Sequence, residues 1–135
     1  MYTLGIDSGS TSTNAVILDE NRQIKAFSVV RTGAKSSQSA DAALADVLKK
    51  AGLNREDISL IVSTGYGRVS IPFADKNVTE ISCHGKGAHL LFPDVHTILD
   101  IGGQDSKAIR LNDNGEVADF VMNDKCAAGT GRFLE

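Results

Sequence analysis

The chain has 135 residues, of which 41% are hydrophobic and 23% charged, and its net charge is −3. These proportions are typical of a soluble globular protein. The slight negative charge argues against nucleic acid as a main partner, and no apolar run is long enough to span a membrane. No basic and apolar export signal is evident at the N-terminus, so a cytoplasmic location is expected, with Cys83 and Cys126 as thiols or metal ligands rather than a disulfide.

The first half of the sequence predicts four strands and one helix. Apolar and polar residues alternate, as in half-buried strands, over residues 2–6, 15–18, 24–30 and 58–62. Between the third and fourth strands, apolar residues recur at helical spacing from residue 40 to residue 51. Ser36, Ser37 and Ser39 are candidate N-caps for this helix, and Gly52 is its expected C-terminal stop.

The second half predicts a helix followed by three strands. The helix covers residues 82–91 and ends before Pro93. The strands cover residues 97–101, 107–111 and 116–121, and the last two form a hairpin around a polar turn. Cys83 and the three histidines have no partners at metal-site spacing, so structural roles are expected for them.

The second half also repeats the first. A shift of 93 positions places Asp7 on Asp100 and Gly9 on Gly102, and it matches strand residues such as Val16 with Ile109 and Phe27 with Phe120. This echo predicts a structural duplication. Because the second copy stops after its hairpin, the chain is expected to be a partial protein, with a first ATPase lobe over residues 1–95 and the start of a second over 96–135.

The turn after the first strand has the composition of a phosphate-binding loop. Small residues let backbone N–H groups approach a phosphate, and the hydroxyls of Ser8, Ser10 and Thr11 beside Gly9 add donors. Asp7, at the end of the strand, is a candidate ligand for Mg²⁺ and a candidate catalytic carboxylate. An ordinary hairpin turn explains the same residues equally well.

A second turn of the same type follows residue 99. Gly102 and Gly103 form a second candidate phosphate clamp, Asp100 is a further magnesium ligand, and Asp105 and Gln104 are candidates for ordering the attacking water. The alternative is a glycine bulge with solvated acids. No P-loop pattern is present, which disfavours a P-loop NTPase.

The third candidate site lies near the end of the sequence. The run Gly129, Thr130 and Gly131 at a helix start would form another anion-binding nest. Cys126 precedes it among small neighbours. A lone cysteine is usually a buried structural residue, so local chemistry leaves a cofactor role open. The Gly65-Tyr66-Gly67-Arg68 segment is either a loop near a cleft or a simple turn.

Together these motifs resemble the activator ATPases of 2-hydroxyacyl-CoA dehydratases and the ATPase subunits of benzoyl-CoA reductase. The resemblance covers essentially the whole chain, and its most specific segment runs from Asn123 to Phe133. It implies a two-lobed α/β fold of the actin, hexokinase and sugar-kinase type. It also implies an ATP-hydrolysing homodimer that shares one [4Fe–4S] cluster, with Cys126 as a ligand, and passes an electron from a ferredoxin or flavodoxin to the dehydratase.

Asn14 departs from the family pattern, which usually has lysine after the first phosphate turn. Two rival functions stay open, and the departure at Asn14 favours the second of them. One is a sugar or acetate kinase-like phosphotransferase on the same fold, which would not need Cys126. The other is a non-catalytic nucleotide-binding module.

Overall fold

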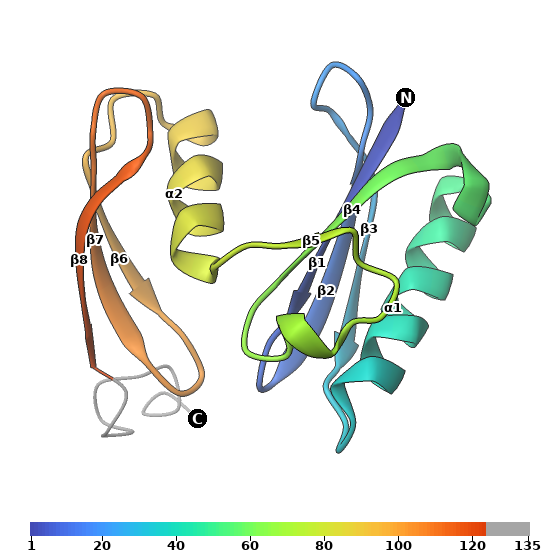
Figure 1. Cartoon of the computed structure of the whole chain (residues 1–135). Coiled ribbons are helices and arrows are strands. Elements are labelled where there is room, and N and C mark those ends of the chain that lie inside the picture. Colours follow the sequence, from blue (N-terminus) through green and yellow to red (C-terminus); the bar gives the residue numbers. More distant parts are fainter. Residues whose placement is uncertain (124–135) are drawn as a thin grey trace. The chain divides into compact units, whose positions relative to one another are not determined.

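The computed structural model describes residues 1–123, which fold into two compact units, Met1–Val78 and a second that begins at Thr79 (Figure 1). Neither α-helix in this part of the chain has the length and apolarity that crossing a membrane requires. The predicted lobe boundary after residue 95 stays a prediction.

The first unit is a five-stranded mixed sheet covered by one helix. Its strands are β1 (Tyr2–Ser8), β2 (Ser12–Leu18), β3 (Ile24–Arg31), β4 (Ile58–Thr64) and β5 (Lys76–Asn77), in the order β3-β2-β1-β4-β5. The first three strands are antiparallel, and β4 lies parallel to β1. Helix α1 (Ser36–Ala51) connects β3 to β4, and two short 3₁₀ helices, η1 (Arg55–Asp57) and η2 (Arg68–Ser70), flank β4.

Helix α1 packs its small apolar side against β1, β2 and β3. Ala40, Ala43 and Val47 are fully buried against strand residues that include Ile6 and Ile17. The helix ends at Gly52, whose φ of 68° favours glycine, as the sequence predicted.

The predicted serine cap of α1 is wrong. Lys35 occupies the N-cap position and forms no side-chain capping bond. Ser39 lies one turn inside the helix, where its hydroxyl accepts the Gly33 N–H at 2.9 Å. It therefore fastens the incoming loop instead of capping the helix.

The second unit is a helix and a three-stranded antiparallel sheet. It contains α2 (Glu80–Leu91), β6 (Thr97–Ile101), β7 (Ser106–Leu111) and β8 (Val117–Asn123), with β7 in the middle. Gly85 of α2 lies so close to this sheet that an added Cβ would be 3.0 Å from the Leu111 side chain and 3.4 Å from Val117.

The pairing of residues in the two hairpins confirms the predicted duplication. Asp7 pairs with Asn14 in the first hairpin, and the residues 93 positions later, Asp100 and Lys107, pair in the second. The β2–β3 and β7–β8 ladders have bulges at equivalent positions, after Ile17 and after Arg110. Two sequence segments that share strands, turns and irregularities in this way are copies of one structural unit.

The two copies bury opposite faces of equivalent sheets. Ile6 lies under α1 and is 1% exposed, whereas Leu99, its counterpart in the second copy, is 76% exposed. Helix α2 instead lies on the side of Leu111, Ile109 and Lys107, which are all buried. The side chains that follow each Asp-x-Gly turn therefore meet different surroundings in the two copies.

Candidate functional site

The β1–β2 turn is held in a tight, defined shape. The Gly9 N–H donates to the Ser12 carbonyl at 3.0 Å, which closes the turn. Thr32, just after β3, donates its hydroxyl to the Gly9 carbonyl at 2.9 Å and its N–H to the Thr11 carbonyl at 3.0 Å. Ser10 and Thr11 remain exposed at the tip. The predicted phosphate turn thus presents small polar groups on a fixed backbone, as anion binding requires.

The loop after β4 closes against the end of β1. Asp7 pairs with Thr64 in the parallel ladder, so the next residue, Gly65, follows the end of β1. A Cβ on Gly65 would overlap the Asp7 carboxylate and would lie 2.6 Å from the Ser8 carbonyl oxygen. The Gly67 N–H donates to that same carbonyl at 2.9 Å. The Gly65–Gly67 loop is therefore part of the candidate site.

Ser8 is the buried member of this cluster. It is 1% exposed, and among the described residues its hydroxyl has no hydrogen-bond partner. A buried polar atom without a partner costs free energy, so such an atom commonly marks a place where a ligand or water completes the bonding. Asp7 lies next to it, half-buried at the end of the strand. This placement fits a phosphate and its cation.

The β6–β7 turn repeats this construction. The Gly102 N–H donates to the Asp105 carbonyl at 2.8 Å, in the position of the Gly9–Ser12 bond. Gly103 is half-buried, and Gln104 is exposed at the tip. Asp105 is 8% exposed, so its carboxylate points into the unit and not toward solvent.

A network of charged groups joins the second turn to β6, β7 and α2. The Lys107 ammonium is 2.6 Å from Asp105 Oδ1 and 3.5 Å from Asp100 Oδ2. His84 of α2 places Nδ1 2.8 Å from the same Asp100 Oδ2. Sequence reasoning missed Lys107 and treated His84 as structural. The 93-residue repeat could have indicated Lys107, because it lies where the first copy has Asn14.

Lys107 is a charged group inside the unit, since its side chain is only 4% exposed. Burial alone would lower the pKa of this ammonium. The hydrogen bond to Asp105 and the negative charges of Asp105, Asp100 and Glu80 outweigh that effect and raise the pKa above its ordinary value. Lys107 is therefore positively charged throughout the neutral pH range.

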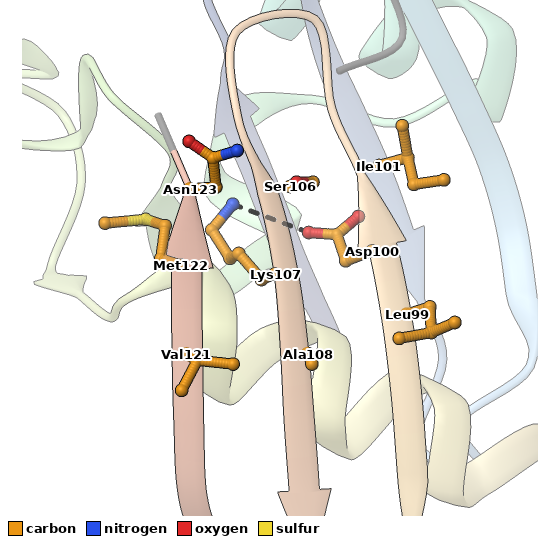
Figure 2. Close-up of a pocket in the computed structure, with 9 residues that line it drawn as sticks. All are labelled: Leu99, Asp100, Ile101, Ser106, Lys107, Ala108, Val121, Met122 and Asn123. Carbon is orange, nitrogen blue, oxygen red and sulfur yellow. Dashed lines mark hydrogen bonds and ion pairs between the residues drawn. The ribbon is translucent and has the colours of Figure 1, made fainter. Parts of the chain in front are cut away.

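Asp100 and Lys107 border a hollow of about 440 Å³ on the second unit (Figure 2). Its remaining lining is mostly apolar and includes Leu99, Ile101 and Val121. The sticks in Figure 2 show the Lys107–Asp100 contact crossing from β7 to β6. Because successive side chains of a strand point to opposite faces, the Asp100 carboxylate lies on the α2 side of the sheet, whereas Leu99 and Ile101 line the hollow from the other face.

The remaining predicted site residues lie outside the described part of the chain. These are Cys126, Gly129, Thr130 and Gly131. Within residues 1–123, no group of three or more histidine, cysteine, aspartate or glutamate side chains is arranged to hold a metal ion. Cys83 is a free, half-buried thiol in α2.

The fold is that of the actin–hexokinase class, which confirms the predicted fold. The activator of 2-hydroxyisocaproyl-CoA dehydratase from Clostridium difficile, solved with bound ADPNP, matches 99% of this chain and 50% of its own at a TM-score of 0.92 and 47% identity. The ROK hexokinase from Thermus thermophilus matches 87% of this chain and 48% of its own at a TM-score of 0.63, with 14% identity, which shows the fold alone.

Residues 4–135 match the BadF/BadG/BcrA/BcrD ATPase family, and the chain belongs to that family. It is 57% identical over 135 residues to the activator of lactoyl-CoA dehydratase from Anaerotignum propionicum, which covers the whole chain and 52% of that protein. It is 48% identical over 136 residues to the (R)-2-hydroxyglutaryl-CoA dehydratase activating ATPase from Acidaminococcus fermentans, with the same coverage. The chain thus spans about half the length of these curated relatives.

Proposed function

We propose that this chain is the nucleotide-binding N-terminal part of an ATP-hydrolysing activator of a 2-hydroxyacyl-CoA dehydratase. The observation that carries the proposal is the pair of equivalent Asp-x-Gly turns, each closed by the same backbone hydrogen bond. Phosphoryl transfer depends on positioning and on neutralisation of charge, which two such turns can supply. The relative solved with ADPNP supports a nucleotide as the ligand.

Each turn has an assigned part in this proposal. The backbone and hydroxyl groups of Ser8–Thr11 and of Gly102 and Gly103 would contact phosphates, with Gly129–Gly131 as a third nest. Asp7 and Asp100 would hold Mg²⁺, whose preference for carboxylate and water oxygens fits these strand-end residues. Gln104, exposed at the turn, would orient the attacking water, whereas the buried Asp105 would hold Lys107.

The second part of the proposal concerns electron transfer. A [4Fe–4S] cluster held by Cys126 and one further cysteine from each of two subunits would supply a low-potential electron for the dehydratase after reduction by a ferredoxin or flavodoxin. The residues around Cys126 supply the expected thiolate chemistry, because Lys125 is adjacent and small residues follow. Resemblance to the dehydratase activators supports this assignment.

The test uses the full-length protein under anaerobic conditions. We expect about four irons per dimer and Mg²⁺-dependent ATP hydrolysis. Cys126→Ala should remove the iron, whereas the matched control Cys83→Ala should retain it, because Cys83 lies within α2 and does not belong to the proposed cluster motif in the sequence. Full iron content in Cys126→Ala would overturn the cluster assignment.

Two further results would redirect the proposal. ATP hydrolysis by an iron-free protein only in the presence of a sugar or carboxylate acceptor would indicate a kinase. A protein that binds nucleotide without hydrolysing it would be a binding module.

A further inference from the structure

We propose that Lys107 and His84 are positioning residues for Asp100, which together fix the direction in which its carboxylate meets a magnesium–phosphate ligand. The inference rests on the proposed ATPase function, in which Asp100 serves the cation.

Both contacts on Asp100 fall on the same oxygen. His84 Nδ1 lies 2.8 Å and Lys107 Nζ 3.5 Å from Oδ2. Within residues 1–123, no hydrogen bond or ion pair is made to the other oxygen, Oδ1. A carboxylate held through one oxygen keeps a fixed plane and leaves its second oxygen as an oriented acceptor. The Asp100 side chain is 20% exposed, so an incoming ligand can reach this carboxylate.

The charges in the network favour a cation beside Asp100. Lys107 balances one of the two carboxylates, Asp105 and Asp100, and leaves a net negative charge on the group. The 2.6 Å contact with Asp105 is the shorter one, so Asp105 is the main partner of the ammonium. Asp100 receives the weaker second contact, which orients it while leaving its charge available to Mg²⁺.

The duplication separates a positioning role from a purely structural one. The first copy has Ser12 where the second has Asp105, and Asn14 where the second has Lys107. Yet both hairpins share the same register, the same closing bond and the same bulge. The hairpin therefore forms without this ion pair. A buried ion pair that the fold does not need, beside a candidate phosphate turn, indicates a functional role.

The experiment measures ATP hydrolysis by the full-length protein as a function of Mg²⁺. Lys107→Met removes the charge at nearly constant length, and His84→Leu removes the second contact while leaving the Lys107–Asp105 pair intact. We expect kcat to fall by roughly 10²-fold for Lys107→Met, the typical cost of a misplaced reacting group. Both variants should need a higher Mg²⁺ concentration to reach half of the maximal rate. In both, the fold-change in the KM for ATP should be smaller than the fold-change in kcat.

The controls address folding and local charge. His84→Asn places an amide donor near the position of Nδ1 and should restore most of the rate. Arg110→Met removes an exposed cation from the same strand, where the guanidinium lies 3.9 Å from Asp119, and should leave the kinetics unchanged. If Lys107→Met does not fold, His84→Leu still tests the positioning role. The His84 side chain is 41% exposed, so its replacement should leave the fold intact.

The outcomes distinguish the inference from the function on which it rests. Folded His84→Leu with wild-type kcat and wild-type Mg²⁺ dependence would overturn the positioning role, even if the wild-type enzyme is an active ATPase. A wild-type protein without Mg²⁺-dependent hydrolysis would overturn the proposed function, and the inference with it.

Discussion

Substitution of Gly65 tests whether the loop after β4 must approach β1 as closely as the structure shows. Gly65 has a φ of 86°, a backbone conformation that side chains disfavour by about 1–2 kcal/mol. A Cβ at this position would also lie 2.6 Å from the Ser8 carbonyl oxygen and 2.8 Å from its carbon. Forcing an extra atom into such a packed site typically costs about 1–3 kcal/mol. We therefore expect Gly65→Ala to destabilise the chain by about 2–5 kcal/mol.

Two other glycines separate the cost of the backbone conformation from the cost of the close contact. Gly52 has a φ of 68°, but no atom lies within 4 Å of its hypothetical Cβ, so Gly52→Ala should show the backbone cost alone. Gly67 has a φ of −90°, and the three atoms nearest its hypothetical Cβ would be the Ser8 and Ser36 hydroxyl oxygens and the Ser36 Cβ, the last at 2.9 Å. Gly67→Ala should therefore show a contact cost alone, which rotation of the two hydroxyls reduces only in part because the Ser36 Cβ cannot rotate away.

Urea unfolding of the 135-residue chain, followed by circular dichroism, gives the three changes in unfolding free energy. Gly65→Ala, which combines both costs, should lose the most free energy of unfolding, and Gly52→Ala should lose the least. Equal losses for Gly65→Ala and Gly52→Ala would refute the close approach of the loop to Asp7 and Ser8. In the full-length protein, Gly65→Ala should also weaken nucleotide binding, because it displaces the end of β1.

Three further outcomes follow from single contacts. The hydrogen bond to Asp113 raises the pKa of His96 above its ordinary value near 6.5. The contact therefore stabilises the folded chain fully below pH 6.5, and this stabilisation is lost as the pH rises through the folded-state pKa. An NMR titration should show a raised midpoint that returns toward 6.5 in Asp113→Asn; an unchanged midpoint would contradict the bond. Ile6→Ala should cost about 2–5 kcal/mol, and Leu99→Ala, at the equivalent exposed position, less than about 0.5 kcal/mol. Denaturant unfolding of the 135-residue chain compares the two, and similar losses would mean that the copies do not bury opposite faces. Thr32→Val should cost about 1–3 kcal/mol, because the Gly9 carbonyl loses a donor, and no loss would show that the β1–β2 turn does not depend on this bond.

Local pattern predicted most of the elements, because alternation and helical spacing reflect burial that neighbouring residues already determine. The strands of both hairpins and the Gly52 stop were predicted in this way. Strand β5 was not predicted, since two exposed residues carry no periodicity and pair only through β4. The Lys35 N-cap was also missed. Serine is favoured at N-caps in general, but this preference does not reveal that Ser39 instead accepts a hydrogen bond from the Gly33 N–H.

The candidate site was only partly predictable, for a related reason. The two glycine turns are contiguous in sequence, so their composition revealed them. The contact of Gly65 with Asp7 depends on parallel pairing of β1 with β4, which are separated by α1. The Lys107 network depends on a helix side chain, His84, which meets a strand only after folding. Such long-range contacts leave no local pattern.

The difference between the two hairpins can be tested by transplanting the charge pair. Ser12→Asp with Asn14→Lys introduces into the first copy the residues that the second copy has as Asp105 and Lys107. In the present chain the Asn14 amide lies 3.4 Å from the Ser12 hydroxyl, so the two side chains already face each other. Because both positions are only half-buried, we expect a favourable coupling of about 0.5–1 kcal/mol.

A double-mutant cycle of unfolding free energies isolates that coupling from the cost of each single change. The coupling should weaken at high salt, as expected for a partly exposed pair. The reverse exchange, Asp105→Ser with Lys107→Asn, should show a larger coupling, because Lys107 is buried and its removal alone leaves the Asp105 charge without compensation. Zero coupling in the first hairpin would mean that equal backbone register does not give equal side-chain geometry. A coupling would show that the two hairpins share one framework, which accepts the charge pair without a change of fold.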